Sequence, residues 1–503
     1  MIGKVILVGA GPGDPGLLTR KGLAALERAD VVVYDRLVSP AILARIPARA
    51  EKIDVGKQPD RHPVPQHEID RILLNKALEG HYVVRLKGGD SFLFGRGGEE
   101  LELLAEHGVP FEVVPGVTSA LAAPSYGGIP VTHRDFASSL HIITGHRRAG
   151  TELAIDFEAL VRAGGTLVFL MGVAALQEIT QGLLAAGMDP DTPAAMVERG
   201  STPQQRRLSA TLSTLARRAG EEHIQNPAVI VVGQVCSLAE RFDWFDRLPL
   251  KGQSIIVTRP EDRAGALSDK LRALGADVME YPCIRTTSIL PCASLDEALT
   301  NIDRYQWLAF TSPAGVETLW SWLDSRGLDV RALGNCKLAA LGPGTAKALK
   351  NHGLRADLMP AVYDAEHLGQ ALAATATGAV LMLRAQEASP ALPAALEQAG
   401  IPYDDIAIYR TEFCDHWREP LNAAIANGVK FVSFTSASTV KAFVALAEGV
   451  DLTQITGICI GAQTADEAKK HGIPVIVAKR ATIDALVDAF REAVTEFSKT
   501  ERS

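Results

Sequence analysis

The sequence predicts an α/β protein of several domains with mostly parallel sheets. Short β-rich runs alternate with Ala- and Leu-rich amphipathic segments throughout the chain, which is typical of strands joined by crossover helices. With 503 residues the chain is too long for one hydrophobic core, so two to four domains are expected. Its composition, 47% hydrophobic and 22% charged, is that of an ordinary globular protein. The expected strands are VILV (5–8), VVVY (31–34), YVVRL (82–86), FEVV (111–114), HIIT (141–144), TLVFLM (166–171), AVIVV (228–232), SIIVT (254–258), WLAF (307–310), VLML (380–383) and FVSF (431–434).

A domain boundary is expected at FDWFDRLPLKG, residues 242–252, where aromatic and charged residues, a proline and a glycine precede a new strand. Beyond this boundary the chain repeats itself, which predicts two similar α/β lobes of about 120 residues facing each other across a cleft. A purely architectural duplication is the alternative. Arg259, Gly275 and Arg285 recur as Arg384, Gly400 and Arg410, FTSPAGVETL (310–319) recurs as FTSASTVKAF (434–443), and LGPGTAKALKNHG (341–353) recurs as IGAQTADEAKKHG (460–472).

Charge and composition exclude several classes of protein. A net charge of −8 argues against a general nucleic-acid binder, which needs a basic field. No apolar run reaches the ~18 residues of a membrane span, and the amino terminus has no signal-peptide pattern. The six cysteines are scattered, with no C-x-x-C pair, so neither a metal site nor a disulfide framework is expected. A cytoplasmic protein without nucleic-acid or membrane partners follows.

The loop GPGDPG, Gly11–Gly16, follows the first expected strand and satisfies the dinucleotide pattern G-x-G-x-x-G. Asp35, after the second strand, stands near the spacing of a ribose-binding carboxylate. The loop is nevertheless poor for pyrophosphate, because Pro12 and Pro15 have no N–H to donate and Asp14 would repel an anion. A tight turn against which a neutral or cationic ligand packs is the better interpretation, and a nucleotide-dependent oxidoreductase remains the alternative.

The first half carries a series of long motifs: VGAGPGDPGLLTRKGLAALERADVVVYDRLV (8–38), VGK (55–57), RLKGGDSFLFGRGGEE (85–100), VPFEVVPGVTSALAAPSYGGIPVTHR (109–134), TLVFLMG (166–172) and NPAVIVVG (226–233). In these motifs the chain resembles the uroporphyrinogen-III C-methyltransferases, which are S-adenosylmethionine-dependent tetrapyrrole methylases. The resemblance covers about residues 1–245 and implies the tetrapyrrole-methylase fold, with α/β subdomains at about 1–133 and 134–245. It also implies S-adenosyl-L-methionine as cofactor, a sulfonium compound without phosphate.

The methylated macrocycle must lose a proton after methyl transfer. The resemblance implies that Asp35 accepts this proton, and it also implies that Lys57 is a proton donor. A turn-capping carboxylate and a solvated loop lysine are the structural alternatives. Family members usually have Pro where this chain has Ser91, which puts the rigidity of the Gly-Gly-Asp turn in question. Met171 as core filler and Gly200 as a simple turn residue are further alternatives. The implied cofactor-binding residues are Pro12, Gly88, Gly89, Asp90, Leu93, Thr118, Ser119, Met171, Gly200 and Ala228.

The implied substrate carries eight carboxylates, for which arginines are suitable partners because they bind carboxylates bidentately. A solvated charged surface is the alternative for each of them. The candidates are Arg134, Arg147, Arg148, Arg206 and Arg207.

The second half carries the motifs QSIIVTRPEDRAGALSDKLRALGADVMEYPCIRT (253–286), WLAFTSPAGVETL (307–319), LAALGPGTAKAL (338–349), IAIYRT (406–411) and FVSFTSASTVKAF (431–443). In these motifs it resembles uroporphyrinogen-III synthase, over about residues 251–491. The resemblance implies ring closure of hydroxymethylbilane with inversion of the last pyrrole, in a two-lobed α/β domain at 253–497 joined by a linker at 246–252. One lobe is expected from 253–287 and 411–497, and the other from 288–410.

Tyr409 is the residue to which the synthase resemblance assigns an acid role, a hydrogen bond to the departing hydroxide. A tyrosine packed at a strand end is the alternative. The repeated FTS and GPGT/GAQT loops are expected to bind substrate carboxylates through backbone N–H groups, although such loops are also ordinary helix caps. Their candidate residues are Thr311, Ser312, Thr345 and Thr464.

The two resemblances combine into one expectation, because the product of the second half is the substrate of the first. We expect a bifunctional enzyme that forms uroporphyrinogen III and methylates it twice to precorrin-2, as a homodimer through the methyltransferase half. A carboxy-terminal half that only binds or delivers substrate is the alternative. The sequence leaves open whether the product feeds cobalamin or sirohaem and whether the intermediate passes directly between sites.

Overall fold

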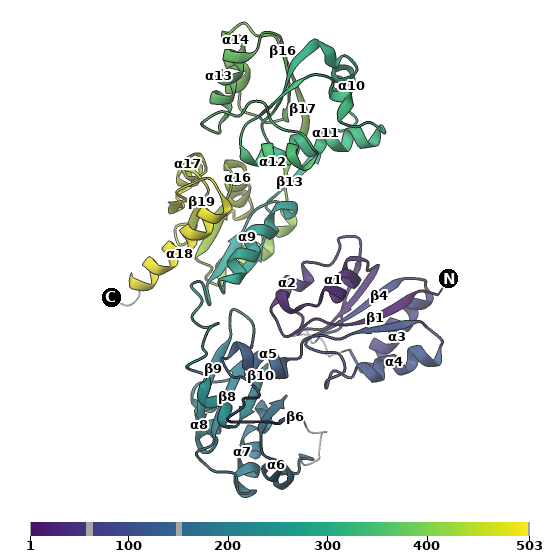
Figure 1. The fold of residues 1–503 in the computed structure, drawn as a ribbon, viewed down its shortest axis with the longest axis vertical. Helices are drawn as coiled ribbons and strands as arrows, with labels where there is room; N and C mark the ends of the chain where they lie inside the picture. Colours follow the sequence, from purple (N-terminus) through teal and green to yellow (C-terminus); the bar gives the residue numbers. More distant parts are fainter. Residues whose placement is uncertain (1, 57–63, 147–152, 501–503) are drawn as a thin grey trace. The chain divides into compact units, whose positions relative to one another are not determined.

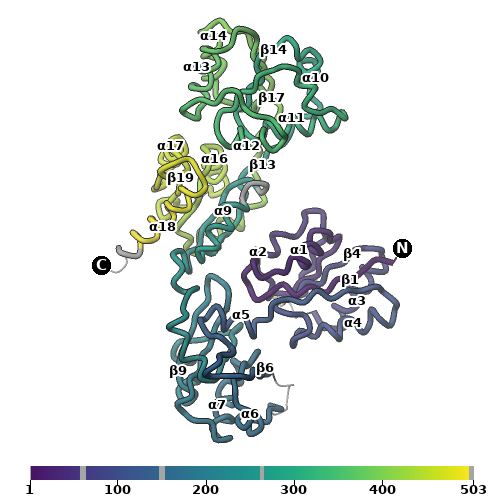
Figure 2. Tube along the Cα trace, in the orientation of Figure 1, coloured from purple at the N-terminus to yellow at the C-terminus, as the bar shows by residue number. Residues whose placement is uncertain are grey.

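The computed structural model describes residues 2–56, 64–146 and 153–500. These residues form β-sheets with helices packed against them (Figure 1). Two compact units are formed, and Figure 2 traces the path of the chain through both. One unit holds the chain up to Ile255, Leu267–Met279 and the chain from Val487 onward. The other holds Ile256–Ala266 and Glu280–Leu486. In the described part of the chain, no helix has both the length and the apolar character needed to cross a membrane.

The first sheet is entirely parallel and has the order β3-β2-β4-β1-β5. Side chains alternate along β1, so Ile6 and Val8 enter the core beneath α1 and α2, while Val5 and Leu7 enter the core beneath α3 and α4. Helices therefore cover both faces, as a parallel sheet requires. The elements are β1 (Lys4–Gly9), η1 (Pro15–Leu17), α1 (Arg20–Glu27), β2 (Val31–Tyr34), α2 (Pro40–Leu43), β3 (Glu51–Asp54), α3 (Gln66–Leu78), β4 (Tyr82–Lys87), α4 (Gly97–Glu106) and β5 (Phe111–Val114).

The second sheet has the order β6-β7-β10-β8-β9 and departs, within this sheet, from the mostly parallel pairing expected for the chain. Only β6 and β7 are parallel; the other three neighbouring pairs are antiparallel. The reason is the connection: β8 returns directly as β9, without the crossover helix that a parallel pair needs. The elements are α5 (Ser119–Tyr126), β6 (Leu140–Thr144), α6 (Phe157–Ala163), β7 (Thr166–Leu170), η2 (Val173–Ala175), α7 (Leu176–Ala185), β8 (Pro193–Glu198), β9 (Arg206–Thr211), α8 (Leu212–Glu221), β10 (Ala228–Val232) and η3 (Gln234–Leu238).

The third sheet has the order β12-β11-β18-β19-β20 and combines strands from both ends of the second half. β18, β19 and β20 are parallel to one another. The elements are β11 (Ser254–Val257), α9 (Glu261–Ala273), β12 (Asp277–Glu280), η6 (Asp415–Trp417), α15 (Arg418–Ala426), β18 (Phe431–Phe434), α16 (Ala437–Leu446), β19 (Thr456–Cys459), α17 (Ala462–Lys470), β20 (Val475–Val477) and α18 (Ile483–Thr500).

The fourth sheet has the order β13-β17-β16-β14-β15 and uses the middle of the second half. β14, β15, β16 and β17 pair in parallel, and β13 lies antiparallel to β17. The repeated FTS motif ends β14 here and β18 in the third sheet, and a helix follows it in both places. The elements are β13 (Ile284–Ser288), α10 (Ala293–Thr300), η4 (Ile302–Arg304), β14 (Tyr305–Phe310), α11 (Pro313–Ser325), η5 (Val330–Leu333), β15 (Lys337–Ala340), α12 (Pro343–Asn351), α13 (Ala365–Thr375), β16 (Ala379–Ala385), α14 (Ala391–Gln398) and β17 (Tyr403–Phe413).

Candidate active sites

Three backbone N–H groups of the GPGDPG loop, those of Gly11, Asp14 and Gly16, donate hydrogen bonds within the protein. Gly11 and Gly89 exchange hydrogen bonds at 3.1 and 2.7 Å, which ties this loop to the Gly-Gly-Asp turn after β4. The Asp14 amide donates to Ser201 Oγ at 3.4 Å, and the Gly16 amide donates to the Asp14 carboxylate at 2.7 Å. Because the two prolines carry no N–H, the loop has little to offer a pyrophosphate, and the geometry supports the interpretation as a rigid turn.

Asp14 also has a partner that the sequence did not indicate. Its second oxygen accepts a hydrogen bond of 2.7 Å from the hydroxyl of Tyr126, the last residue of α5. Burial, and then the Asp14 carboxylate, raises the pKa of Tyr126 above its ordinary value, so the hydroxyl remains a donor. The Tyr126 ring packs edge-on against Trp244 and Phe245, at centroid distances of 4.9 and 4.8 Å. The first loop is thereby anchored to α5.

The Gly-Gly-Asp turn is held by its own carboxylate. Asp90 accepts hydrogen bonds from the amides of Phe92 and Leu93 through one oxygen and from Gly116 through the other, at 2.9 to 3.0 Å. These three bonds fix the turn without the proline that Ser91 replaces. Gly89 has φ +70°, and a Cβ there would have a single neighbour within 4 Å, the Ser119 amide at 3.9 Å. The backbone of the turn is thus open to a ligand.

The carboxyl ends of β1, β2, β4 and β5 bring several of the predicted residues to one edge of the first sheet. Ligands of open parallel sheets bind at this edge. Thr118 caps α5 by accepting from the Ala120 amide at 3.3 Å, and Ser119 begins that helix. The edge residues are Pro12 after β1, Asp35 after β2, Gly88, Gly89 and Asp90 after β4, and Thr118 and Ser119 after β5.

Three predicted residues come from the second sheet and its loops. Met171 follows β7 with φ +56° and is 47% exposed, so it is not core filler. A Cβ on Gly200 would lie 2.4 Å from Ala123 Cβ, so Gly200 allows the loop after β8 to approach α5 closely. Ala228 begins β10, pairs with Glu198 of β8 and is buried.

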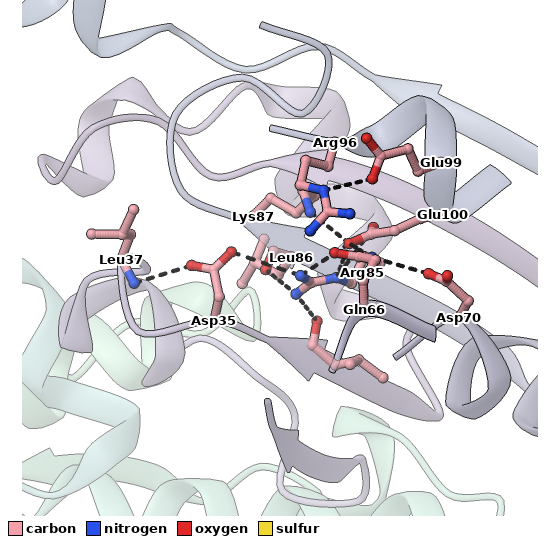
Figure 3. A network of polar contacts seen from close by, with 11 residues as sticks. Asp35, Leu37, Gln66, Asp70, Arg85, Leu86, Lys87, Arg96, Glu99 and Glu100 are labelled. Atoms are coloured by element: carbon pink, nitrogen blue, oxygen red, sulfur yellow. Dashed lines mark hydrogen bonds and ion pairs between the residues drawn. The ribbon is translucent and has the colours of Figure 1, made fainter. Parts of the chain in front are cut away.

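Asp35 adjoins a buried network of charged side chains (Figure 3). One of its oxygens accepts a hydrogen bond from the Leu37 amide at 3.0 Å, so Asp35 does cap a turn, as the structural alternative expects. The other oxygen lies 3.9 Å from Arg85 Nη2. Arg85 and Lys87 both bind Glu100, which is fully buried. Burial, and then the charge of Arg85, lowers the pKa of Lys87 below its ordinary value.

Sequence reasoning missed this network, although a signal was present. Arg85 and Lys87 are two residues apart in β4 and therefore share one face of an otherwise apolar strand. Two cations on a buried face need an anion, and Glu100 on α4 supplies it.

The predicted arginines have different surroundings. The side chain of Arg207 is 7% exposed; it donates to the Gly127 and Ala239 carbonyls, both at 2.9 Å, and pairs with Glu240 at 2.7 Å. Arg206 pairs with Glu198 at 2.7 Å and also donates to two carbonyls at the end of α8. These contacts give both side chains a role in holding the second sheet, although Arg206 is also exposed. Arg134 is exposed as well. Lys57, Arg147 and Arg148 lie outside the described residues.

Tyr409 and Ser312 form the candidate site in the second half. Tyr409 lies in β17, is 6% exposed and packs in the core of the fourth sheet. Its hydroxyl is 2.7 Å from Ser312 Oγ. Ser312 is the N-cap of α11 and also accepts from the Gly315 amide at 3.3 Å. Packing and a polar contact to a side chain are therefore both present.

The repeated loops all begin helices. Thr311 lies between the end of β14 and Ser312, the N-cap of α11. Thr345 and Thr464 occupy the first turns of α12 and α17. The side chains of Thr345 and Thr464 are buried, so these two residues would act only through their backbone. The N–H groups in a first turn have no partner within the helix and are suited to carboxylates. In the described residues, no group of three or more His, Cys, Asp and Glu is placed to hold a metal.

Comparison with known proteins assigns a class to each half. Residues 4–216 match the family of tetrapyrrole (corrin/porphyrin) methylases, and residues 265–488 match uroporphyrinogen-III synthase HemD. The methylase match covers the sheet edge that carries Asp35, and the synthase match covers Tyr409.

Similar proteins extend over both halves. A "Porphyrin biosynthesis protein HemD" of Ruminiclostridium josui is 50% identical over 493 residues, which cover 97% of this chain and 98% of that protein. A uroporphyrinogen-III C-methyltransferase of Bacillus subtilis (strain 168) is 43% identical over 353 residues, covering 70% and 72%. The crystal structure of a Thermus thermophilus uroporphyrin-III C-methyl transferase with S-adenyl homocysteine is 46% identical, with a TM-score of 0.41, covering 47% of this chain and 99% of that one.

The chain belongs to the family that joins a tetrapyrrole methylase to a uroporphyrinogen-III synthase. It is a bifunctional enzyme of tetrapyrrole biosynthesis, with uroporphyrinogen-III C-methyltransferase and uroporphyrinogen-III synthase activities.

Proposed function

We propose that the second half closes hydroxymethylbilane to uroporphyrinogen III and that the first half methylates this product twice, to precorrin-2. The observation that carries the proposal is the pairing, in one chain, of two halves whose product and substrate coincide. The domain limits proposed are 1–245 for the methyltransferase and 253–497 for the synthase.

The residues at the carboxyl edge of the first sheet fit S-adenosyl-L-methionine. The ligand has a sulfonium cation and no phosphate, which suits a loop in which the amides of Gly11, Asp14 and Gly16 already donate within the protein and Asp14 is an anion. The open backbone at Gly89 offers a close approach. When bound, the cofactor supplies an electrophilic methyl group to a pyrrole carbon. Pro12, Gly88–Asp90, Leu93, Thr118, Ser119, Met171, Gly200 and Ala228 would hold it.

Asp35 then acts as proton acceptor at this edge. Its exposed fraction is 26%, so the carboxylate is accessible while its position is fixed by the Leu37 amide. A carboxylate there can take the proton that the methylated ring must lose. Lys57 is the proposed proton donor, and Arg134, with Arg147 and Arg148, is proposed to bind substrate carboxylates.

In the synthase half fewer side chains need to take part in the chemistry. The pyrrole nitrogen of the substrate drives the loss of hydroxide, and the Tyr409 hydroxyl, paired with Ser312, supplies one hydrogen bond to the departing oxygen. The first turns of α11, α12 and α17 are proposed to hold substrate carboxylates through backbone N–H groups.

A homodimer through the methyltransferase half is also part of the proposal. Large apolar side chains are exposed on the loops of this half: Leu37 is 60% exposed and Phe92 is 57% exposed. Light scattering on the full chain tests the dimer, and a monomeric mass at micromolar concentration would refute it.

The cysteines are free thiols, which suits a reducing cytoplasm.

A two-stage assay tests the function. The full chain is given hydroxymethylbilane alone, and the product is oxidised and analysed for the type III isomer. S-adenosyl-L-methionine is then added and the mass is followed for two methyl additions. Type I isomer alone in the first stage would favour the alternative, a carboxy-terminal half that only binds substrate. Tight binding of NAD in place of S-adenosyl-L-methionine would favour an oxidoreductase.

A further inference from the structure

The buried network beside Asp35 contains more charge than the packing of the sheet requires. Glu100 is completely buried and accepts from Arg85 Nε and Nη2 at 3.2 Å and from Lys87 Nζ at 2.6 Å. Gln66 donates to the same carboxylate at 3.3 Å and to Asp70 at 3.0 Å. Figure 3 shows these groups converging on Glu100. Such a cluster is costly to desolvate, and apolar side chains of similar volume would pack α4 on β4 at least as well.

The location of the network indicates what it does. β4 ends at Lys87, directly before the Gly-Gly-Asp turn, so the cations lie next to the edge where the cofactor is proposed to bind. Glu100 balances only one of the two positive charges of Arg85 and Lys87. Asp35 is a further anion beside this pair: its Oδ2 lies 3.9 Å from Arg85 Nη2.

Arg85 is itself held at several points. Its Nε and Nη2 donate to the Glu100 carboxylate, and its Nη1 donates to the carbonyls of Val33 and Leu86, at 3.4 and 3.2 Å. A guanidinium fixed in this way can present Nη2 to Asp35 in only one orientation. The Leu37 amide fixes the other oxygen of Asp35, so the carboxylate is located from two sides.

We propose that Glu100 is a positioning residue for methyl transfer: it fixes the guanidinium of Arg85, and through Arg85 it orients the carboxylate of Asp35. This inference rests on the proposed role of Asp35 as proton acceptor. Glu100 does not touch substrate or cofactor. Its effect is on the geometry of the acceptor, and a small displacement of a reacting group costs rate more than binding.

The test is Glu100→Gln in the full chain, with Glu102→Gln, an exposed carboxylate on the same helix, as the matched control. We expect kcat for methylation to fall about 10- to 100-fold, with KM and the dissociation constant for S-adenosyl-L-methionine unchanged within about twofold. Glu102→Gln should behave as the parent. Equal losses in kcat and cofactor binding, or an unchanged kcat in a folded Glu100→Gln variant, would overturn the proposal.

Coupling to Asp35 separates positioning from a general structural role. In an Asp35→Asn background, Glu100→Gln should have almost no further effect on kcat, because the group that it positions has lost its function. A full additional loss would overturn the proposal. If Asp35→Asn alone leaves turnover intact, the role of Asp35 fails first, which distinguishes the two failures.

Arg85→Lys serves if Glu100→Gln does not fold. The substitution keeps the positive charge of the network but loses the planar fork that reaches Glu100 and Asp35 together. The same fall in kcat with retained cofactor binding is expected. A folded Arg85→Lys variant with parental kcat would overturn the proposal.

Discussion

In the methyltransferase half, Asp35 lies beside a buried group of three charged side chains, whereas in the synthase half the hydroxyl of Tyr409 lies 2.7 Å from a neutral hydroxyl, that of Ser312. The difference follows the chemistry proposed for each half. A group that must accept a proton needs a fixed position and charge, so Asp35 is located by Leu37 and Arg85. A group that assists a reaction driven by the substrate needs only one donor. The two halves should therefore respond very differently to the loss of one polar atom.

The largest effect is expected from Asp35→Asn. The amide oxygen of Asn can still accept from the Leu37 amide, so the turn should persist while the proton acceptor is lost. Methylation should slow by roughly 10²-fold or more, and cofactor affinity should be kept. Steady-state turnover and a binding titration on the same preparation measure this, with synthase activity as the internal control. Unchanged turnover with tightly bound cofactor would leave Asp35 only its turn-capping role.

A smaller effect is expected from Tyr409→Phe. The variant loses one neutral hydrogen bond, worth about 0.5–1.5 kcal/mol, so synthesis should slow a few-fold to about tenfold. Ser312 keeps its bond to the Gly315 amide, so the start of α11 should not change. Methylation of supplied uroporphyrinogen III should be intact. A parallel fall of both activities would contradict separate sites, and unaffected synthesis would make Tyr409 a packing residue.

The smallest effect is expected from Pro12→Ala. The first loop gains one N–H and loses the fixed φ of proline, so the folded loop has more freedom to lose on binding and affinity for S-adenosyl-L-methionine should fall about two- to fivefold. No affinity for NAD should appear, because Asp14 and Pro15 remain. Isothermal titration with both ligands decides the matter. Measurable NAD binding by the parent chain would show that the loop has been misinterpreted.

Local chemistry explains which features the sequence could predict. The expected strands are present because their apolar runs are long and bounded by turn residues, and the two prolines of the first loop determine its donors wherever the loop lies. The direction of β8 and β9 could not be predicted, because antiparallel pairing depends on the connection rather than on the strand. The family resemblance, rather than spacing, supplied the roles of Asp35 and Tyr409.

Tertiary neighbours determine the rest. Arg207 resembles half of a solvated pair in the sequence, yet its side chain is 7% exposed and residues 32 to 80 positions away supply its acceptors. Glu100 looks like one of several surface acids in the run GGEELE until α4 packs against β4. Neither environment can be inferred from the residue and its immediate neighbours.

The order of strands in the third sheet has a consequence for synthesis on the ribosome. β11 leaves the exit tunnel early, but its neighbour β18 begins only at Phe431, with the whole fourth sheet encoded between them. At a translation rate of about 5–20 residues per second, this edge of β11 stays without that partner for on the order of 10–30 s. The fourth sheet, which is contiguous in the chain, can close first. Nascent chains stalled before Phe431 should therefore present an unpaired apolar strand to chaperones, and the synthase half becomes resistant to proteases only near the end of translation.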